Sequence, residues 1–237
     1  MKHLLAYLTL ALAVAFAISP AFTDPFTGFE ENQLPIPQID PPIQPAGYAF
    51  AIWGLIYGWL IVSGVFGVWA RAGDDGWSRA RVPLSLSLLV GVPWLAIANA
   101  SAIWATVAIL WMAGFALLAL INAPRDDRWW LQAPVAIYAG WLTAASCVSI
   151  GTTLAGYGVA FGSFGWAIAG ILLALAVSLL MHRKRPEAPE YLATVIWALV
   201  GIIVANGAAQ IWISGLAALG IAALLGAAIF GLGKRSV

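Results

Sequence analysis

Residues 163–181, SFGWAIAGILLALAVSLLM, decide the fold class of this chain, because they form an apolar run without a charged side chain. The run ends at the basic cluster His182-Arg183-Lys184-Arg185. A helix needs about 20 consecutive apolar residues to cross the hydrocarbon core of a bilayer. An apolar run of this length that ends in positive charge is typical of a membrane-spanning helix whose basic end faces the cytoplasm.

The composition of the whole chain supports a membrane protein. Of its 237 residues, 62% are hydrophobic and only 9% are charged, whereas soluble domains carry about 25% charged residues. Lipid cannot pair with backbone polar groups, so spanning segments must be helices or a closed barrel, and the apolar runs here lack the alternation of strands. The net charge of +1 gives no reason to expect a nucleic-acid partner, and the single Cys147 excludes an intramolecular disulfide.

We therefore predict an all-α, polytopic helical membrane protein with about eight transmembrane helices. The expected spans are 4–21, 47–70, 83–101, 103–122, 131–152, 163–181, 190–206 and 210–232. Two tight junctions, 99–103 and 206–210, leave the alternative that each pair of spans is one long kinked helix. The first span also resembles a signal peptide, whose cleavage would leave seven spans; because its apolar stretch is long, we expect it to be retained.

The basic residues constrain this topology. All eleven fall on one side of an eight-span arrangement: Lys2, Arg71, Arg79, Arg81, Arg125, Arg128, Arg183, Lys184, Arg185, Lys234 and Arg235. The positive-inside rule makes that side the cytoplasm. We expect a multi-pass protein of the inner (plasma) membrane with both termini cytoplasmic.

The loop of residues 22–46 lies on the other side of the predicted topology. It holds four acidic residues, no Lys or Arg, and five prolines between Pro35 and Pro45. Prolines at this density favour extended, polyproline-like backbone. We expect this loop to form an ordered lid on the outer face.

The predicted spans offer little for catalysis. Their membrane interior contains no Asp, Glu, Lys, Arg or His, whereas proton relays, ion-coupled transport and a retinal Schiff base need such groups inside the membrane. His3 and His182 both lie at the cytoplasmic edge, and no hydrolase or nucleotide-binding motif occurs. We therefore expect no catalytic site and no metal site.

Aromatic residues and amides are the remaining candidates for a site. In the second span, Trp53 and Tyr57 share one helix face, with Phe50 one turn earlier. The fifth span places Pro134, Tyr138, Trp141, Ala145 and Ser149 along one face, and Asn99 at the outer end of the third span is the amide expected to meet these rings. Converging aromatics with a few polar tips under an ordered loop predict a pocket for a flat, mostly apolar ligand.

These residues resemble the TspO/MBR family of tryptophan-rich sensory proteins and translocator proteins. Pro45, Tyr48, Phe50, Trp53 and Tyr57 are similar to the family's Pro-rich stretch and W-x-x-L-Y motif, and Asn99 to its third-span Asn. Pro134, Tyr138, Trp141, Ala145 and Ser149 are similar to its fifth-span motif, although Ser149 replaces an Asn and the usual Pro pair before Trp53 is missing. The strings PAGYAFAIWGLIY and IYAGW look more like an extended, eight-span branch.

The resemblance implies a five-helix bundle over residues 1–155, with the Pro-rich loop 22–46 and three additional C-terminal helices over 156–237 in one continuous membrane domain. It further implies binding of a porphyrin-type tetrapyrrole or a sterol-like molecule between the first loop and the second and fifth helices. No cofactor is expected to be required, and the expected partners are the lipid bilayer, the hydrophobic ligand and, as in relatives, a second copy in a homodimer.

Three functions remain open from the sequence. The first is a membrane sensor or handler that binds a hydrophobic planar molecule at Tyr48, Phe50, Trp53, Tyr57, Asn99, Pro134, Tyr138, Trp141, Ala145 and Ser149. The second is a facilitative transporter or flippase for such molecules. The third, an enzyme acting on a lipid or isoprenoid, has the least support because no catalytic carboxylate lies inside the predicted spans.

Overall fold

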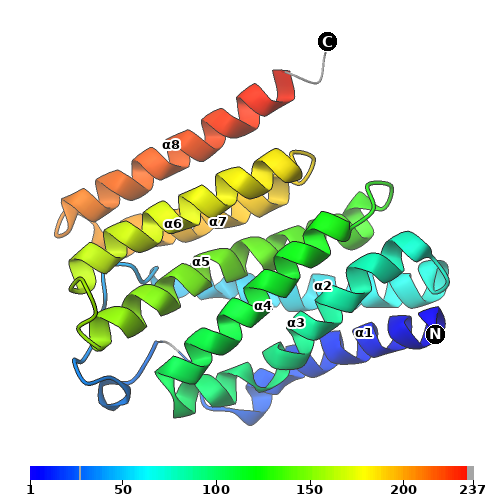
Figure 1. The fold of residues 1–237 in the computed structure, drawn as a ribbon, viewed down its shortest axis with the longest axis horizontal. Helices are drawn as coiled ribbons and strands as arrows, with labels where there is room; N and C mark the ends of the chain where they lie inside the picture. Colours follow the sequence, from blue (N-terminus) through cyan, green and yellow to red (C-terminus); the bar gives the residue numbers. More distant parts are fainter. Residues whose placement is uncertain (27, 234–237) are drawn as a thin grey trace.

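Within residues 1–26 and 28–233, which the structure describes, the computed structural model consists of eight long helices and contains no strand (Figure 1). The helices are α1 (Lys2–Ile18), α2 (Ile52–Arg71), α3 (Asp75–Ala100), α4 (Ala102–Asn122), α5 (Ala133–Gly156), α6 (Ser163–Lys184), α7 (Pro189–Asn206) and α8 (Ile211–Gly233). Each of them, together with the adjoining short helical turn at α1, α2 and α5, is long and apolar enough to cross a membrane. The prediction of an all-α protein with eight spans is confirmed.

Short helical turns complete the architecture. Three 3-10 turns, Ser19–Phe22, Glu31–Gln33 and Gly47–Ala51, lie between α1 and α2. One π-helical turn, Arg128–Gln132, leads into α5. The connection between α1 and α2 is therefore structured along part of its length.

The two tight junctions separate distinct helices. Ser101, between α3 and α4, is extended at φ −160° and ψ 117°, and its hydroxyl oxygen accepts a hydrogen bond from the Trp104 backbone N–H at 3.4 Å. Gly207 ends α7 at φ +50°, a left-handed value that glycine adopts without a steric penalty. The alternative of single kinked spans is therefore wrong at both places.

The third helix begins earlier than predicted, at Asp75 instead of residue 83. The cause is a helix cap, in which the Asp74 carboxylate accepts a hydrogen bond from the Trp77 backbone N–H at 2.8 Å. Arg79 and Arg81 consequently lie in the helix and not in a loop.

Arg81 corrects the prediction that no ionisable side chain lies inside a span. It is 2% exposed, and its guanidinium donates to the Gly67 carbonyl at 2.6 Å and to the Arg71 carbonyl at 3.0 Å. Carbonyls in the last turn of a helix lack partners within the helix. Arg81 therefore donates hydrogen bonds to carbonyls near the C-terminal end of α2, at the end of the bundle that carries the basic connections.

The helix α5 lies at the centre of the bundle. It packs against α4, α6 and α7, contacts α2, and is the most buried of the eight spans. Small residues allow this packing: a β-carbon at Gly140 would lie 2.6 Å from the Tyr191 carbonyl oxygen in α7. The helices α6 to α8 lie on one side of α5, while α1 to α3 lie on the other (Figure 1). The sequence-based division at residue 155 falls at the end of α5, and helices from both segments pack on α5.

Ion pairs join the basic connections at one end of the bundle. The pairs are Lys2–Asp75 at 2.7 Å, Arg71–Asp127 at 2.8 Å, Arg125–Glu187 at 2.9 Å, Arg128–Glu190 at 2.6 Å and Arg185–Glu187 at 2.7 Å. They link the start of α1 to the α2–α3 connection, and the α4–α5 connection to both the α2–α3 and the α6–α7 connections. Lys234 and Arg235, also predicted on this side, lie outside the described residues.

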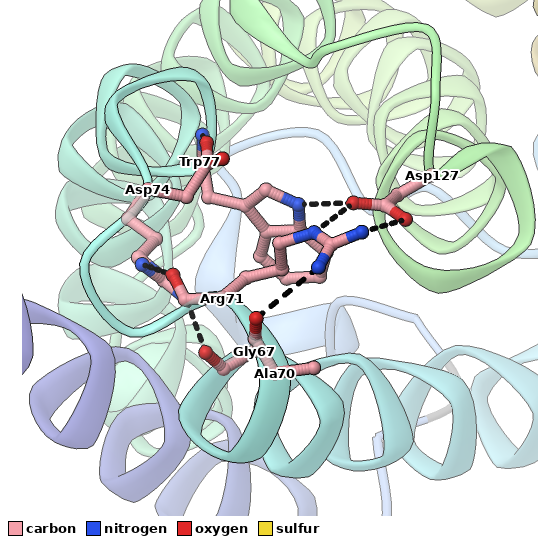
Figure 2. A network of polar contacts seen from close by, with 7 residues as sticks. Gly67, Ala70, Arg71, Asp74, Trp77 and Asp127 are labelled. Atoms are coloured by element: carbon pink, nitrogen blue, oxygen red, sulfur yellow. Dashed lines mark hydrogen bonds and ion pairs between the residues drawn. The ribbon is translucent and has the colours of Figure 1, made fainter.

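Asp127 connects the α4–α5 connection to α2 and α3 (Figure 2). It accepts hydrogen bonds from the Arg71 guanidinium at 2.8 and 3.2 Å and from the Trp77 indole N–H at 2.8 Å. Burial by itself would raise the pKa of Asp127, but these hydrogen bonds and the Arg71 charge outweigh it and hold the pKa below its ordinary value.

Candidate ligand-binding cavity

A cavity of about 260 Å³ lies under the connection between α1 and α2, away from the basic connections. Side chains from each of the helices α1 to α7 line it. Nearly all of them are apolar or aromatic, and neither Lys, Arg nor His occurs among the residues that line it. Apolar concave sites with a few polar groups are typical of small-molecule binding.

The covering connection is held down by hydrogen bonds to the ends of several helices. Asn206 of α7 donates to the Pro42 carbonyl at 2.8 Å, and the backbone N–H of Ile36 donates to the Gly156 carbonyl of α5 at 2.9 Å. Gln33 donates to the carbonyls of Ala98 and Asn99 at 2.8 and 2.9 Å, at the end of α3. The cover is therefore attached to α3, α5 and α7 at once.

An aromatic cluster forms one wall of the cavity. Trp53 and Tyr57 stack with ring centroids 5.3 Å apart, because they lie four residues apart on α2. Trp141 of α5 meets Trp53 at 6.2 Å and Phe50 at 5.6 Å, both edge to face. Phe16 of α1 packs edge-on against Trp53 at 5.6 Å and Tyr57 at 5.0 Å.

Three hydrogen-bond donors of this wall are unused within the protein. Among the described residues, none accepts a hydrogen bond from the indole N–H of Trp53 or Trp141 or from the Tyr57 hydroxyl. Trp94, which also lines the cavity, instead donates to the Ala105 carbonyl at 3.0 Å. A buried indole N–H usually has a partner, so the three unused donors are available to a ligand acceptor.

The structure brings six of the ten predicted site residues to the cavity. These are Phe50, Trp53, Tyr57, Trp141, Ala145 and Ser149. The Ser149 hydroxyl is already paired with the Thr106 hydroxyl at 2.7 Å. The remaining five present rings or small apolar groups at or near the wall.

The other four predicted residues lie outside the lining of the cavity. Tyr138 is fully buried, and its hydroxyl pairs with that of Ser87 in α3 at 2.8 Å. Pro134 lies in the first turn of α5, and the exposed Tyr48 packs on Trp197 at 5.4 Å. Asn99 donates to the Asp24 carbonyl at 3.1 Å, so it supports the cover instead of facing the rings.

The prediction missed two parts of the cavity. Phe16, Phe26 and Phe29 come from α1 and the covering connection, and no spacing in the sequence linked them to the other aromatics. The opposite wall comes from α6 and α7 through Gly170, Ile171, Ala174, Val195, Ala198, Leu199 and Ile202. The sequence predicts a site formed by the first five helices and their connections alone. Residues as apolar as these look like ordinary spans in the sequence, so nothing there singled them out.

A further polar group near the cavity, besides these three donors, lacks a partner. The Thr152 hydroxyl of α5 is buried and unpaired among the described residues, although Thr152 lines the cavity. Thr106 and Thr143, by contrast, each donate to the carbonyl four residues earlier, at 2.8 and 2.9 Å. Sequence alone does not distinguish Thr152 from these.

Comparisons with known proteins agree with the resemblance and extend it. The family model described as TSPO-like protein matches residues 3–231, which include α6 and α7 and most of α8. No curated protein and no solved structure gave a significant match. With eight helices able to span a membrane and a family match over nearly its full length, the chain is a multi-pass membrane protein that belongs to the TSPO-like family.

Proposed function

We propose that this protein binds a flat, mostly apolar small molecule, sterol-like or tetrapyrrole-like, in the cavity between the α1–α2 connection and the helices. The observation that carries the proposal is the aromatic wall of Phe50, Trp53, Tyr57 and Trp141, which faces an apolar cavity with three unused donors. Flat rings stack well on such a wall, and the donors would orient a carbonyl, hydroxyl or ring nitrogen.

Membership of the TSPO-like family supports the same reading. The resemblance implies ligands held between the first loop and the second and fifth helices, and the cavity has its aromatic wall on these elements. We further propose that the ion-paired end faces the cytoplasm of the inner membrane, because it carries the basic residues.

A binding experiment tests the proposal. Protein purified in mild detergent is first examined by absorbance and mass spectrometry for a copurifying molecule. It is then titrated in nanodiscs with protoporphyrin IX and with the fluorescent sterol dehydroergosterol, and tryptophan emission is recorded. We expect saturable quenching by at least one of them; linear, non-saturating quenching by both and no copurified molecule would contradict the proposal.

Transport is a separate question that a flux assay answers. Liposomes containing the protein are loaded with the molecule that binds, and its exit is compared with that from protein-free liposomes. An accelerated exit would add facilitative transport to binding, whereas equal rates would favour sensing or storage.

A further inference from the structure

The distribution of charge around the cavity restricts the kind of ligand that it can take. Lys, Arg and His are absent from residues 4–70, 82–124, 129–181 and 186–233. Every residue that lines the cavity falls in one of these four segments. The described cations of the chain lie instead at the ion-paired end of the bundle.

Asp24 is the one carboxylate among the described residues that line the cavity. It follows the first 3-10 turn, is exposed, and has its backbone carbonyl fixed by Asn99 at 3.1 Å. A residue that both lines a cavity and reaches the surface lies where the cavity opens. Glu30 and Asp40 of the same connection are also exposed and add negative charge to this face.

The aromatic wall has the same electrostatic preference. The faces of Trp and Tyr rings carry partial negative charge and attract cations. Trp53 and Trp141, with Tyr57 stacked on Trp53, lie beside the space that a ligand would occupy. An anion placed there would lose its hydration and find no cation, only the three neutral donors of the wall, whereas a fully buried charge without a counter-charge costs several kcal/mol.

We propose that the cavity selects its ligand by charge: it takes a flat apolar molecule that is uncharged or carries an amine cation beside Asp24, and it rejects the same skeleton bearing a carboxylate. This inference rests on the proposed function and narrows its ligand class. The cavity of about 260 Å³ lies just below the range of about 300–1,000 Å³ for ligand pockets, so a molecule with a few fused rings fits it better than a whole tetrapyrrole. Because the selection is by charge, protoporphyrin IX, which has two carboxylates, should bind less well than its uncharged dimethyl ester.

Three probes with one skeleton test the proposal. The protein in phosphatidylcholine nanodiscs, which carry no net charge, is titrated at pH 7 with 1-pyrenemethanol, 1-pyrenemethylammonium and 1-pyrenecarboxylate. Energy transfer from tryptophan to pyrene reports binding, and empty nanodiscs correct for partition into lipid. We expect saturable binding of the alcohol and the amine, and binding of the carboxylate that is at least about tenfold weaker.

The variant Asp24→Asn assigns the preference to the cavity mouth. Because Asp24 is exposed, its charge should matter modestly: exposed ion pairs contribute about 0.2–1 kcal/mol, which corresponds to amine binding that is up to about fivefold weaker in the variant. Carboxylate binding should tighten by a similar factor, and alcohol binding should stay unchanged. The matched control is Asp40→Asn in the same connection, since Asp40 has φ +44°, which Asn also tolerates, and does not line the cavity.

The outcomes separate the two proposals. A carboxylate that binds within threefold of the alcohol would overturn the charge selection while leaving the proposed function in place. Equal effects of Asp24→Asn and Asp40→Asn on the amine would overturn the role of Asp24. Failure of all three probes to bind saturably would overturn the charge selection, and failure of protoporphyrin IX and dehydroergosterol as well, with no copurified molecule, would overturn the proposed function.

Discussion

Ile43, in the connection that covers the cavity, lies against Gly170 of α6 so closely that a β-carbon at position 170 would overlap its side chain. Gly151 of α5 faces the same side chain, and a β-carbon there would lie 3.1 Å from the Ile43 Cδ1 atom. Ile43 is 2% exposed. Two glycines on neighbouring helices therefore form a notch that holds the cover in place.

We expect Gly170→Ala to push Ile43 out of this notch. Overpacking of a tight site costs about 1–3 kcal/mol, so the apparent melting temperature should fall, and binding of a cavity ligand should weaken because Ile43 and Gly170 both line the cavity. A thiol-reactive dye on the buried Cys147 reports unfolding. The control is Gly58→Ala in α2, where a β-carbon meets open space. Equal melting temperatures of the two variants would contradict the claim that Gly170 makes room for Ile43.

Trp141→Leu should weaken ligand binding without unfolding the protein. Leucine keeps α5 apolar but removes the ring that meets Trp53 and Phe50, together with its indole N–H. Stacking contributes about 0.5–1.5 kcal/mol per aromatic pair, so affinity should fall roughly 2- to 13-fold. Trp69→Leu, at an 83% exposed position, serves as the control in the same fluorescence titration; similar losses in both variants would place the ligand elsewhere.

Asn99→Ala should loosen the cover instead of removing a ligand contact. The Asn99 amide donates to the Asp24 carbonyl and does not line the cavity. We expect faster cleavage after Glu30 by a glutamate-specific protease and faster ligand dissociation. Asn122→Ala removes an amide that bonds only within α4, at the Leu118 carbonyl, and should leave cleavage at the wild-type rate. An unchanged rate of cleavage in Asn99→Ala would show that the α1–α2 connection is held in place without the Asn99 hydrogen bond.

Acid should destabilise the ion-paired end through Asp127. Because its pKa is lowered in the folded protein, the carboxylate contributes stability above its unfolded pKa of about 3.9, and this contribution is lost as the pH falls through the folded pKa. The melting temperature in detergent should therefore fall between about pH 5 and pH 3.

Asp127→Asn isolates this effect. Hydrogen bonds to charged groups contribute about 1.5–3 kcal/mol, so the variant should melt lower than wild type at pH 7, and the difference should shrink near pH 3. Asp126→Asn, at the exposed neighbouring position, is the matched control. A difference between Asp127→Asn and wild type that persists unchanged at pH 3 would assign the loss to packing and not to charge.

The membrane orientation can be tested with reporter fusions. Fusions after Lys184 and at Val237 should both report a cytoplasmic location, and an insertion after Ile36 should report the outer side. The ion pairs place the basic connections at one end, so these connections must share one side. A periplasmic signal after Lys184 together with a cytoplasmic one after Ile36 would mean that the protein is inserted the other way round.

The number of helices and the shared end of their basic connections could be read from the sequence. Both follow from patterns along the chain. The length of each apolar run must match the thickness of the hydrocarbon core, and Lys and Arg collect in the connections on one side of the membrane. The same reasoning misplaced the start of α3, because the Asp74 cap and the pairing of Arg81 with the carbonyls of α2 involve contacts that hydropathy does not register.

Only the tertiary structure decided which face of each helix lines the cavity. Tyr138 and Trp141 lie three residues apart on α5, yet Trp141 lines the cavity while Tyr138 is bonded to Ser87 of α3. In a soluble protein the apolar face of a helix points to the core, but in a membrane the lipid is as apolar as the protein interior. The rotation of each helix is therefore set by close packing with its neighbours, such as Gly140 against Tyr191. Packing of α6 and α7 on α5 likewise brings their side chains to the cavity.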